Sequence, residues 1–241
     1  MRLYRSMTLI GLFLVLPHPQ LRAQNGKVDR DRAVAEIKKL GGTVERDTLG
    51  PGTSIIGVNL KHTPVIDASL EHLKGLTDLE RLFLRDTTVT DDGLVRVKGL
   101  TRLEVLELGR TKVTDKGLLH LRGFAKLRSL DLGGTEVTDA GLAHLTGLGR
   151  LDTLSLEMVA GVSDRGLIHL KGLTNLRTLN LTGTQVTDAG VQDLQKALPK
   201  VTITWRQGAA AERRGAAQVN LGWPRLLYRE TTAATTTGGR E

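Results

Sequence analysis

The 241-residue chain carries a formal charge of +8 and no cysteine, and aromatic side chains make up 3% of it. The lack of thiols excludes disulfides, cysteine nucleophiles, cysteine-ligated zinc and a lipid anchor on cysteine. The excess of basic residues lies in residues 1–23 and 206–241, so the middle of the chain is close to neutral. A nucleic-acid binder concentrates basic charge on its binding face, and we therefore expect no nucleic-acid partner.

Residues 1–23 have the pattern of a signal peptide. Arg2 and Arg5 precede an apolar run over 7–16, and Ala23 offers a small residue before a cut. The prolines at 17 and 19 are expected to break any helix. The run is too short to cross a bilayer, which takes roughly 20 apolar residues. We expect export to the periplasm, the cell surface or the medium, with no transmembrane span in the mature chain. The alternative is membrane anchoring by an uncleaved leader.

Residues 27–51 are expected to form an N-terminal cap for the repeats that follow. Ala33, Ile37 and Leu40 share one face of a helix predicted over 28–40, and Gly41-Gly42 ends this helix. A short strand is expected at 43–45. The cap is needed because the open end of a stacked array exposes an apolar layer.

A period of 24 residues organises the chain from residue 52 to residue 196. Leu84, Leu108 and Leu132 follow this spacing. A period of this length, built on Leu-x-x-Leu-x-Leu, indicates a solenoid. The fifth unit carries one extra residue near 157–161, which we expect to bulge locally. The six units are 52–75, 76–99, 100–123, 124–147, 148–172 and 173–196.

Each unit changes its apolar spacing halfway. Leu-x-Leu places two leucines on one side of a strand, because side chains alternate. Leu118 and Leu121 are three apart and share a helical face, after the N-cap sequence Thr114-Asp115. Strands pair at about 4.8 Å and helices pack at about 8–10 Å, so we expect the stack to curve with its strands on the concave side.

Residues 173–190, LTNLRTLNLTGTQVTDAG, follow the pattern L-T-x-L-x-x-L-x-L-x-x-T-x-V-T-D-x-G. This pattern resembles the leucine-rich repeat family, close to its secreted bacterial members and to the ribonuclease-inhibitor-like superfamily. The resemblance covers about 52–205. It implies a right-handed α/β horseshoe with parallel strands on the concave face and short helices on the convex face. It also implies a non-enzymatic scaffold for a protein or other macromolecule, whose identity stays open.

The end of the chain divides into two parts. Residues 197–205 are expected to form a closing strand, with Trp205 covering the edge. Residues 206–241 are of low complexity and bury too little to offset the entropy of ordering, so we expect a disordered tail. The alternative is a short linear motif or a wall-associating segment at 221–228.

Two polar columns recur with the repeat. Threonine hydroxyls of one column are expected to bond neighbouring turns as a ladder between repeats: Thr63, Thr87, Thr111, Thr135 and Thr184. The other column holds His72, His120, His144 and His169. Helices about 8–10 Å apart keep imidazoles too far apart to share one ion at about 2 Å each. We expect neither a metal nor a cofactor.

The concave face is the expected binding site, because its residues differ between repeats while the buried leucines do not. Lys61, Arg81 and Arg85 surround Phe83, and arginine and an exposed aromatic ring are residue types that dominate interface energies. Acidic residues lie deeper in the stack. We expect a monomer that binds its partner through Lys61, Arg81, Phe83, Arg85, Glu107, Asp131 and Glu157.

Two other functions are weighed against this one. The protein could be a passive structural or envelope-associated spacer, attached through its tail. It could also be a glycoside hydrolase using Glu107 and Asp131, which start about 5 Å apart on adjacent strands. The expected face is open and shallow, however, and nothing there should desolvate a carboxylate as acid catalysis requires.

Overall fold

The computed structural model describes residues 18–47 and 54–205. The chain divides into two compact units, 1–206 and 207–241, and every described residue belongs to the first. Most of the predicted signal peptide (residues 1–17 of 1–23) and all of the predicted disordered tail at 206–241 lie outside the described residues. None of the described helices is long and apolar enough to cross a membrane.

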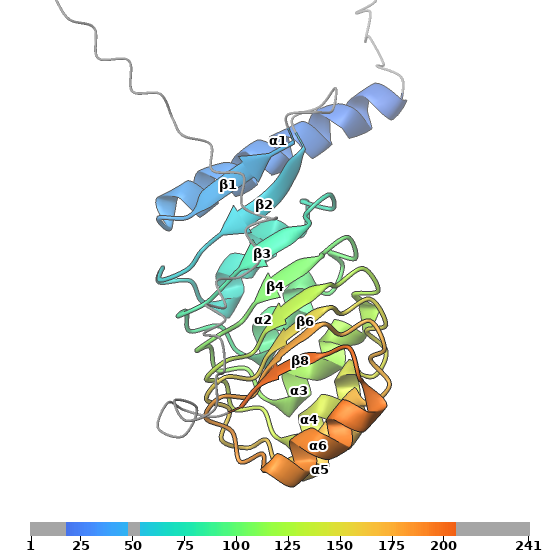
Figure 1. The fold of residues 1–241 in the computed structure, drawn as a ribbon. Coiled ribbons are helices and arrows are strands. Elements are labelled where there is room, and N and C mark those ends of the chain that lie inside the picture. Colours follow the sequence, from blue (N-terminus) through green and yellow to red (C-terminus); the bar gives the residue numbers. More distant parts are fainter. Residues whose placement is uncertain (1–17, 48–53, 206–241) are drawn as a thin grey trace, which may run out of the picture. The chain divides into compact units, whose positions relative to one another are not determined.

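The strands of the described residues form one sheet in which the order along the sheet is the order along the chain (Figure 1). β1 pairs antiparallel with β2, and every later neighbour is parallel. Leu82, Leu106 and Leu130 are Cα partners in successive strands, so each repeat lies in register with the next. The strands are β1 Thr43–Arg46, β2 Ile55–Asn59, β3 Arg81–Phe83, β4 Val105–Glu107, β5 Ser129–Asp131, β6 Thr153–Ser155, β7 Thr178–Asn180 and β8 Thr202–Thr204.

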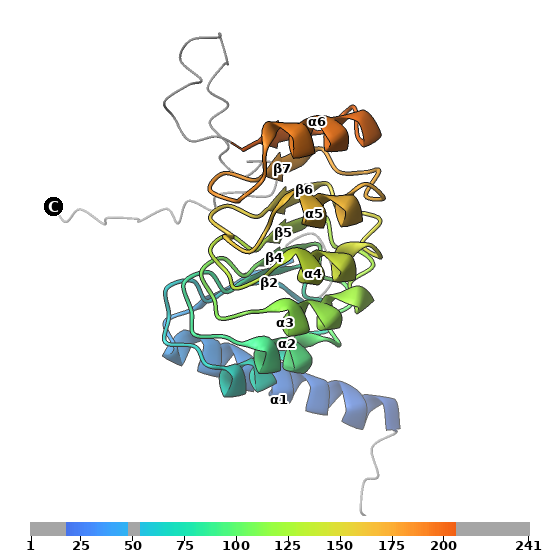
Figure 2. The same ribbon diagram turned by 90° about the horizontal axis from the view of Figure 1, so that it is seen from below.

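The helices of the repeats line the side of the stack opposite the strands (Figure 2). Threonine or serine N-caps open five of them, as the Thr-Asp pattern predicts, and the Thr114 hydroxyl accepts from the Lys116 N–H. The α/β solenoid predicted from the period is therefore confirmed. The helices, with 3₁₀ segments marked η, are α1 His18–Lys39, η1 Asp67–Leu73, α2 Asp91–Val97, α3 Asp115–Leu118, η2 Leu119–Gly123, α4 Asp139–Leu142, η3 Ala143–Leu145, α5 Asp164–Leu167, η4 Ile168–Leu170 and α6 Asp188–Ala197.

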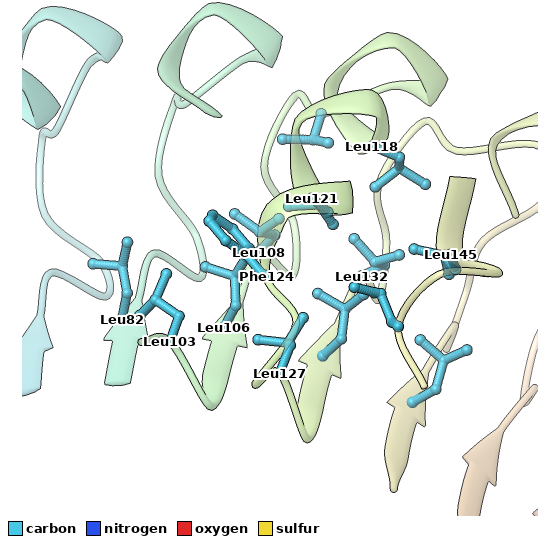
Figure 3. Close-up of a cluster of buried hydrophobic side chains, with 14 of the residues drawn as sticks. Leu82, Leu103, Leu106, Leu108, Leu118, Leu121, Phe124, Leu127, Leu132 and Leu145 are labelled. Carbon is cyan, nitrogen blue, oxygen red and sulfur yellow. The ribbon is translucent and has the colours of Figure 1, made fainter. Parts of the chain in front are cut away.

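The core is a layer of leucines between the sheet and the helices (Figure 3). Strand leucines such as Leu106 and Leu130 and helix leucines such as Leu118 and Leu145 are fully buried. No single repeat buries both of its apolar sides, so each layer depends on its two neighbours.

The N-terminal segment differs in part from the prediction. The expected strand at 43–45 is present as β1, but the helix begins at His18 and not near residue 28. Pro19 lies in its first turn, where proline is tolerated because the backbone N–H there needs no intrahelical partner. The expectation that Pro19 breaks the helix is therefore wrong. α1 buries Ala33, Val34 and Ile37 in the common core.

The extra residue of the fifth repeat lies in the turn after β6. Val159 takes the place of the usual threonine and is buried, while Gly161 forms a bridge with Thr138 of the preceding repeat. A β-carbon at Gly161 would come within 2.7 Å of the Val137 carbonyl oxygen, so the inserted turn needs glycine at this close approach. The inserted residue is absorbed there, and the registers of β6 and β7 are unaffected.

Candidate functional site

The sheet face comprises the strand side chains that alternate with the buried leucines, together with the residues two positions beyond the strand ends. The register places Phe83, Glu107, Asp131 and Ser155 side by side on β3 to β6. Lys61, Arg85 and Glu157 follow the ends of β2, β3 and β6. The predicted site therefore consists of neighbouring rows on one surface.

Three ion pairs cross this face, and each one skips a strand. Lys61 Nζ lies 2.6 Å from Glu107 Oε2, and Arg85 Nη1 lies 2.9 Å from Asp131 Oδ2. Arg81 holds Glu45 with Nη2 at 2.7 Å and Nε at 3.1 Å. Because the partners are two strands apart, each pair spans either three repeats or the cap and two repeats.

In each pair, the residue on or just after the strand between the two partners allows their side chains to reach each other. A β-carbon at Gly109 would lie 2.7 Å from Asp131 Oδ2 and 3.0 Å from Arg85 Nη1, so only glycine leaves room there. Gly57 gives Glu45 the same space, with 2.8 Å from its notional β-carbon to Glu45 Oε2. The Lys61 ammonium instead crosses over the Phe83 ring, 4.8 Å from its centroid, in a cation–π contact.

The carboxylates lie beneath their cation partners. Glu107 and Asp131 are 2% and 1% exposed, whereas the side chains of Lys61 and Arg85 are 22% and 31% exposed. Burial raises the pKa of Glu107, and the hydrogen bond and charge of Lys61 oppose this rise. Asp131 also accepts the Gly133 N–H at 2.9 Å. The face is thus positive toward solvent and negative beneath.

Two expectations about this face are wrong. Phe83 is only 8% exposed, because the Lys61 side chain covers its ring, so it is not the exposed aromatic that the sequence suggested. Glu107 and Asp131 are not solvated on an open, shallow surface, since the diagonal cations cover them. Both errors come from side chains that reach two strands away, which alternation within a strand does not reveal.

The structure brings five of the seven predicted site residues together: Lys61, Phe83, Arg85, Glu107 and Asp131. Arg81 lies at their margin and faces the cap through Glu45. Glu157 is exposed and separate from the cluster, and its Oε2 accepts from Asn180 Nδ2 at 3.3 Å.

The C-terminal half of the sheet face carries hydroxyls and amides. Thr153, Ser155, Thr178, Asn180 and Thr182 are half-buried there. Where the two halves meet, the Oγ of buried Ser129 has no hydrogen-bond partner among the described residues. The face therefore changes along the stack from paired charges to mainly uncharged polar groups, with Glu157 as an exposed acidic residue among them.

The threonine column does not link repeats as expected. Each hydroxyl donates to the carbonyl three residues earlier in its own repeat, as Thr87 Oγ1 does to Leu84 at 2.7 Å and Thr111 Oγ1 to Leu108 at 2.6 Å. These bonds close the turn after the strand within each repeat.

A ladder between repeats does exist, and the sequence reasoning missed it. Asp91 accepts from both the N–H and the hydroxyl of Thr114 in the next repeat, at 2.8 and 2.7 Å. The same pair of bonds joins Asp67 to Thr90, Asp115 to Thr138, Asp139 to Ser163 and Asp164 to Thr187. Trp205 Nε1 donates to Asp188 at 3.1 Å and so occupies the last aspartate.

The ladder explains the glycine of each Thr-Asp-x-Gly sequence. A β-carbon at Gly93, Gly117 or Gly141 would collide with the aspartate of the preceding repeat. One period before Asp67 the chain has Thr43 in place of an aspartate, and the first repeat carries Ser69 where the later repeats have glycine. That exception in the sequence was the signal that could have revealed the ladder.

The histidine column lies on the helix side. Arg122 Nη2 lies 2.8 Å from His144 Nδ1, which places a cation beside this imidazole. Within residues 18–47 and 54–205, no three histidine or carboxylate side chains lie close enough together to hold a metal ion.

Comparison with known proteins concerns the repeats. Residues 125–145 and 172–194 match the model of a family described as Leucine Rich repeat. No curated protein matches the chain in sequence.

Two solved structures from Listeria monocytogenes are similar in fold. One is an internalin (inlF), with a TM-score of 0.46 and 18% identity, covering 80% of this chain and 59% of that chain. The other is an internalin C2, with a TM-score of 0.44 and 23% identity, covering 71% of this chain and 92% of that chain. The chain spans about three-fifths of the length of the first of these proteins.

The family match and the architecture agree. The matched segments lie in two of the six units, and the same period, leucine register and strand–turn–helix order recur in the other units. The units of this chain are therefore leucine-rich repeats in pattern and architecture, and two segments match the family model itself.

Proposed function

We propose that this protein is a non-enzymatic scaffold that recognises a protein or other macromolecular partner through its sheet face. The observation that carries the proposal is the fixing of Lys61 and Arg85 by carboxylates buried beneath them. Cations held in place lose little side-chain entropy on binding, so this surface is prepared for an acidic partner.

The two halves of the face favour one orientation of that partner. Acidic groups fit over the paired charges near Phe83, and polar backbone or side chains fit over the hydroxyls and amides near Thr178 and Asn180. An asymmetric pattern of this kind gives specificity more than affinity.

The hydrolase alternative gains no support from the carboxylates. Both are committed to cations, and Asp131 accepts a further N–H from Gly133. Groups covered in this way build a rigid surface, and a substrate would have to displace Lys61 and Arg85 to reach them.

Site-specific photocrosslinking tests the proposal. A benzophenone amino acid at Thr178 probes the sheet face, and the same group at Lys116, exposed on α3, is the matched control. We expect a defined adduct with one partner from position 178 and none from position 116. An adduct from position 116 alone, or equal adducts from both, would contradict the placement. Loss of cellular location in a chain ending at Trp205, without any adduct from position 178, would favour the spacer.

A further inference from the structure

The edge of the sheet at which the parallel strands begin changes its charge along the stack. In its N-terminal half, the acidic residues Asp78 and Glu80 are paired with Arg102. Arg102 Nη1 lies 2.7 Å from Asp78 Oδ1, and Arg102 Nη2 lies 4.0 Å from Glu80 Oε1. Its C-terminal half is basic, with Lys126, Arg128, Arg150 and Arg177 at the equivalent positions of later repeats. The repeat therefore presents opposite charges from the same positions.

A hollow of about 450 Å³ lies in this basic half. Three successive repeats line it with Arg128, Arg150, Asp152, Asn175 and Arg177, which we call the arginine hollow. Its volume falls in the range of about 300–1,000 Å³ that small-molecule sites occupy.

The lining of the arginine hollow carries more positive than negative charge. Asp152 is its one acidic lining residue, and Asp152 already accepts Arg128 Nε at 3.3 Å and Thr153 Oγ1 at 2.9 Å. In the part of the chain that the structure describes, no carboxylate lies within 4.0 Å of the Arg150 or Arg177 guanidinium. Two exposed guanidinium groups are thus left uncompensated beside a third.

Clustered guanidinium groups repel one another, and an anion between them removes that cost. The planar fork of arginine matches tetrahedral oxyanions by two parallel hydrogen bonds. The Asn175 amide, held by the Gly149 carbonyl at 2.6 Å, adds a fixed polar group on the wall. We propose that the arginine hollow is a binding site for a doubly charged oxyanion, the chemistry of a phosphate or sulfate group. The site lies at the edge of the sheet and does not depend on the proposed function of the sheet face.

Titration calorimetry on the full chain tests this proposal with inorganic phosphate and inorganic sulfate in separate arms, at ionic strength held constant with sodium chloride. We expect saturable binding of at least one anion. Arg150→Gln removes charge-assisted hydrogen bonds and should weaken it about tenfold or more. Arg102→Gln is the matched control, because Arg102 occupies the same repeat position but is paired with Asp78; it should leave the affinity unchanged.

A gain of affinity provides the opposite test. Asp152→Asn keeps the shape of the side chain and removes the one negative charge of the lining, so it should strengthen binding of the same anion. The proposal is overturned if neither anion binds beyond the chloride reference. It is also overturned if Arg102→Gln weakens binding as much as Arg150→Gln does, or if Asp152→Asn fails to strengthen it.

Discussion

Glycine and aspartate in neighbouring repeats depend on each other. The Asp91 carboxylate occupies the space that a side chain at residue 117 would need, and it uses that space to bond Thr114. In a helix such as α3, alanine would otherwise be favoured over glycine by about 1 kcal/mol. The aspartate therefore determines what its neighbour can be.

A double-mutant cycle tests this dependence. Asp91→Ala should lower the free energy of unfolding by about 1–3 kcal/mol, because it leaves the Thr114 N–H without its partner. Gly117→Ala should also destabilise, but in the Asp91→Ala background its cost should fall or change sign. Urea denaturation gives the unfolding free energies of the wild type, the two single variants and the double variant. Ser69→Ala, at the equivalent position without a preceding aspartate, should be close to neutral, and strict additivity would contradict the account.

Glu107 gives the protein a specific pH dependence. Burial raises its pKa above the ordinary value of 4.5, so the folded chain binds this proton more tightly than the unfolded chain does. Its contribution to stability is then largest below pH 4.5 and falls as the pH rises through the folded pKa. The unfolding free energy of the wild type minus that of Glu107→Gln should therefore increase as the pH is lowered from 7 toward 4.5. Denaturation at several pH values checks this, and a difference that is constant or shrinks would contradict it.

Some residue roles could be predicted from the sequence, and others could not. The leucine columns and the threonine N-caps follow from spacing within one repeat, because their partners are local. The pairs Lys61–Glu107 and Arg85–Asp131 depend on register across three strands and on the missing side chain at Gly109. The spacing of residues within one repeat does not show which side chains contact residues two strands away.

At the scale of elements, the turn after each strand adopts a left-handed conformation. The third residue after each of β2 to β7 has positive φ, and it is glycine only at Gly134 and Gly183. Met158, with φ of 58°, is 56% exposed and makes the turn of the enlarged fifth repeat. A methionine in this conformation costs roughly 1–2 kcal/mol relative to the ordinary helical region.

Replacing Met158 by asparagine should therefore stabilise the protein. Asparagine tolerates positive φ without the backbone entropy of glycine, and we expect a gain of about 0.5–1 kcal/mol. Gly134→Ala is the reciprocal change and should destabilise by about 1 kcal/mol or more, because it places a β-carbon at positive φ and 3.2 Å from Arg110 Cγ. Thermal denaturation of both variants gives the signs, and a destabilised Met158→Asn would show that the turn is not strained.

The elements themselves were largely predictable. A period that switches between Leu-x-Leu and a three-residue spacing predicts a strand and a helix in each repeat, as the structure has them. The start of α1 was not predictable from Pro17 and Pro19. The sequence alone does not distinguish a proline in the first turn of a helix from a proline that breaks a helix.

At the scale of the whole repeat unit, each layer contacts only its neighbours, so an interior repeat is replaceable. Deleting 100–123 would bring Thr138 to the place of Thr114 opposite Asp91, and Asp131 to the place of Glu107 opposite Lys61. The ladder and one diagonal pair would then form again with equivalent residues.

This deletion should be tolerated better than the loss of an end. We expect the shortened chain to keep a cooperative thermal transition, because repeats interact only with adjacent repeats. A chain ending at Ala197 loses β8 and the Trp205 bond to Asp188, and it should melt at a lower temperature or aggregate. Circular dichroism melts compare the two, and a lower melting temperature for the interior deletion would contradict the nearest-neighbour description.

The bonds from Asp67 to Trp205 run in one direction, since every interior coil offers a carboxylate onward and receives one from behind. A gene segment encoding a whole coil can for this reason be copied or lost without inventing new chemistry, whereas the first and last coils have no substitute. During evolution, such an array can therefore gain or lose interior repeats, whereas its first and last repeats have to be kept.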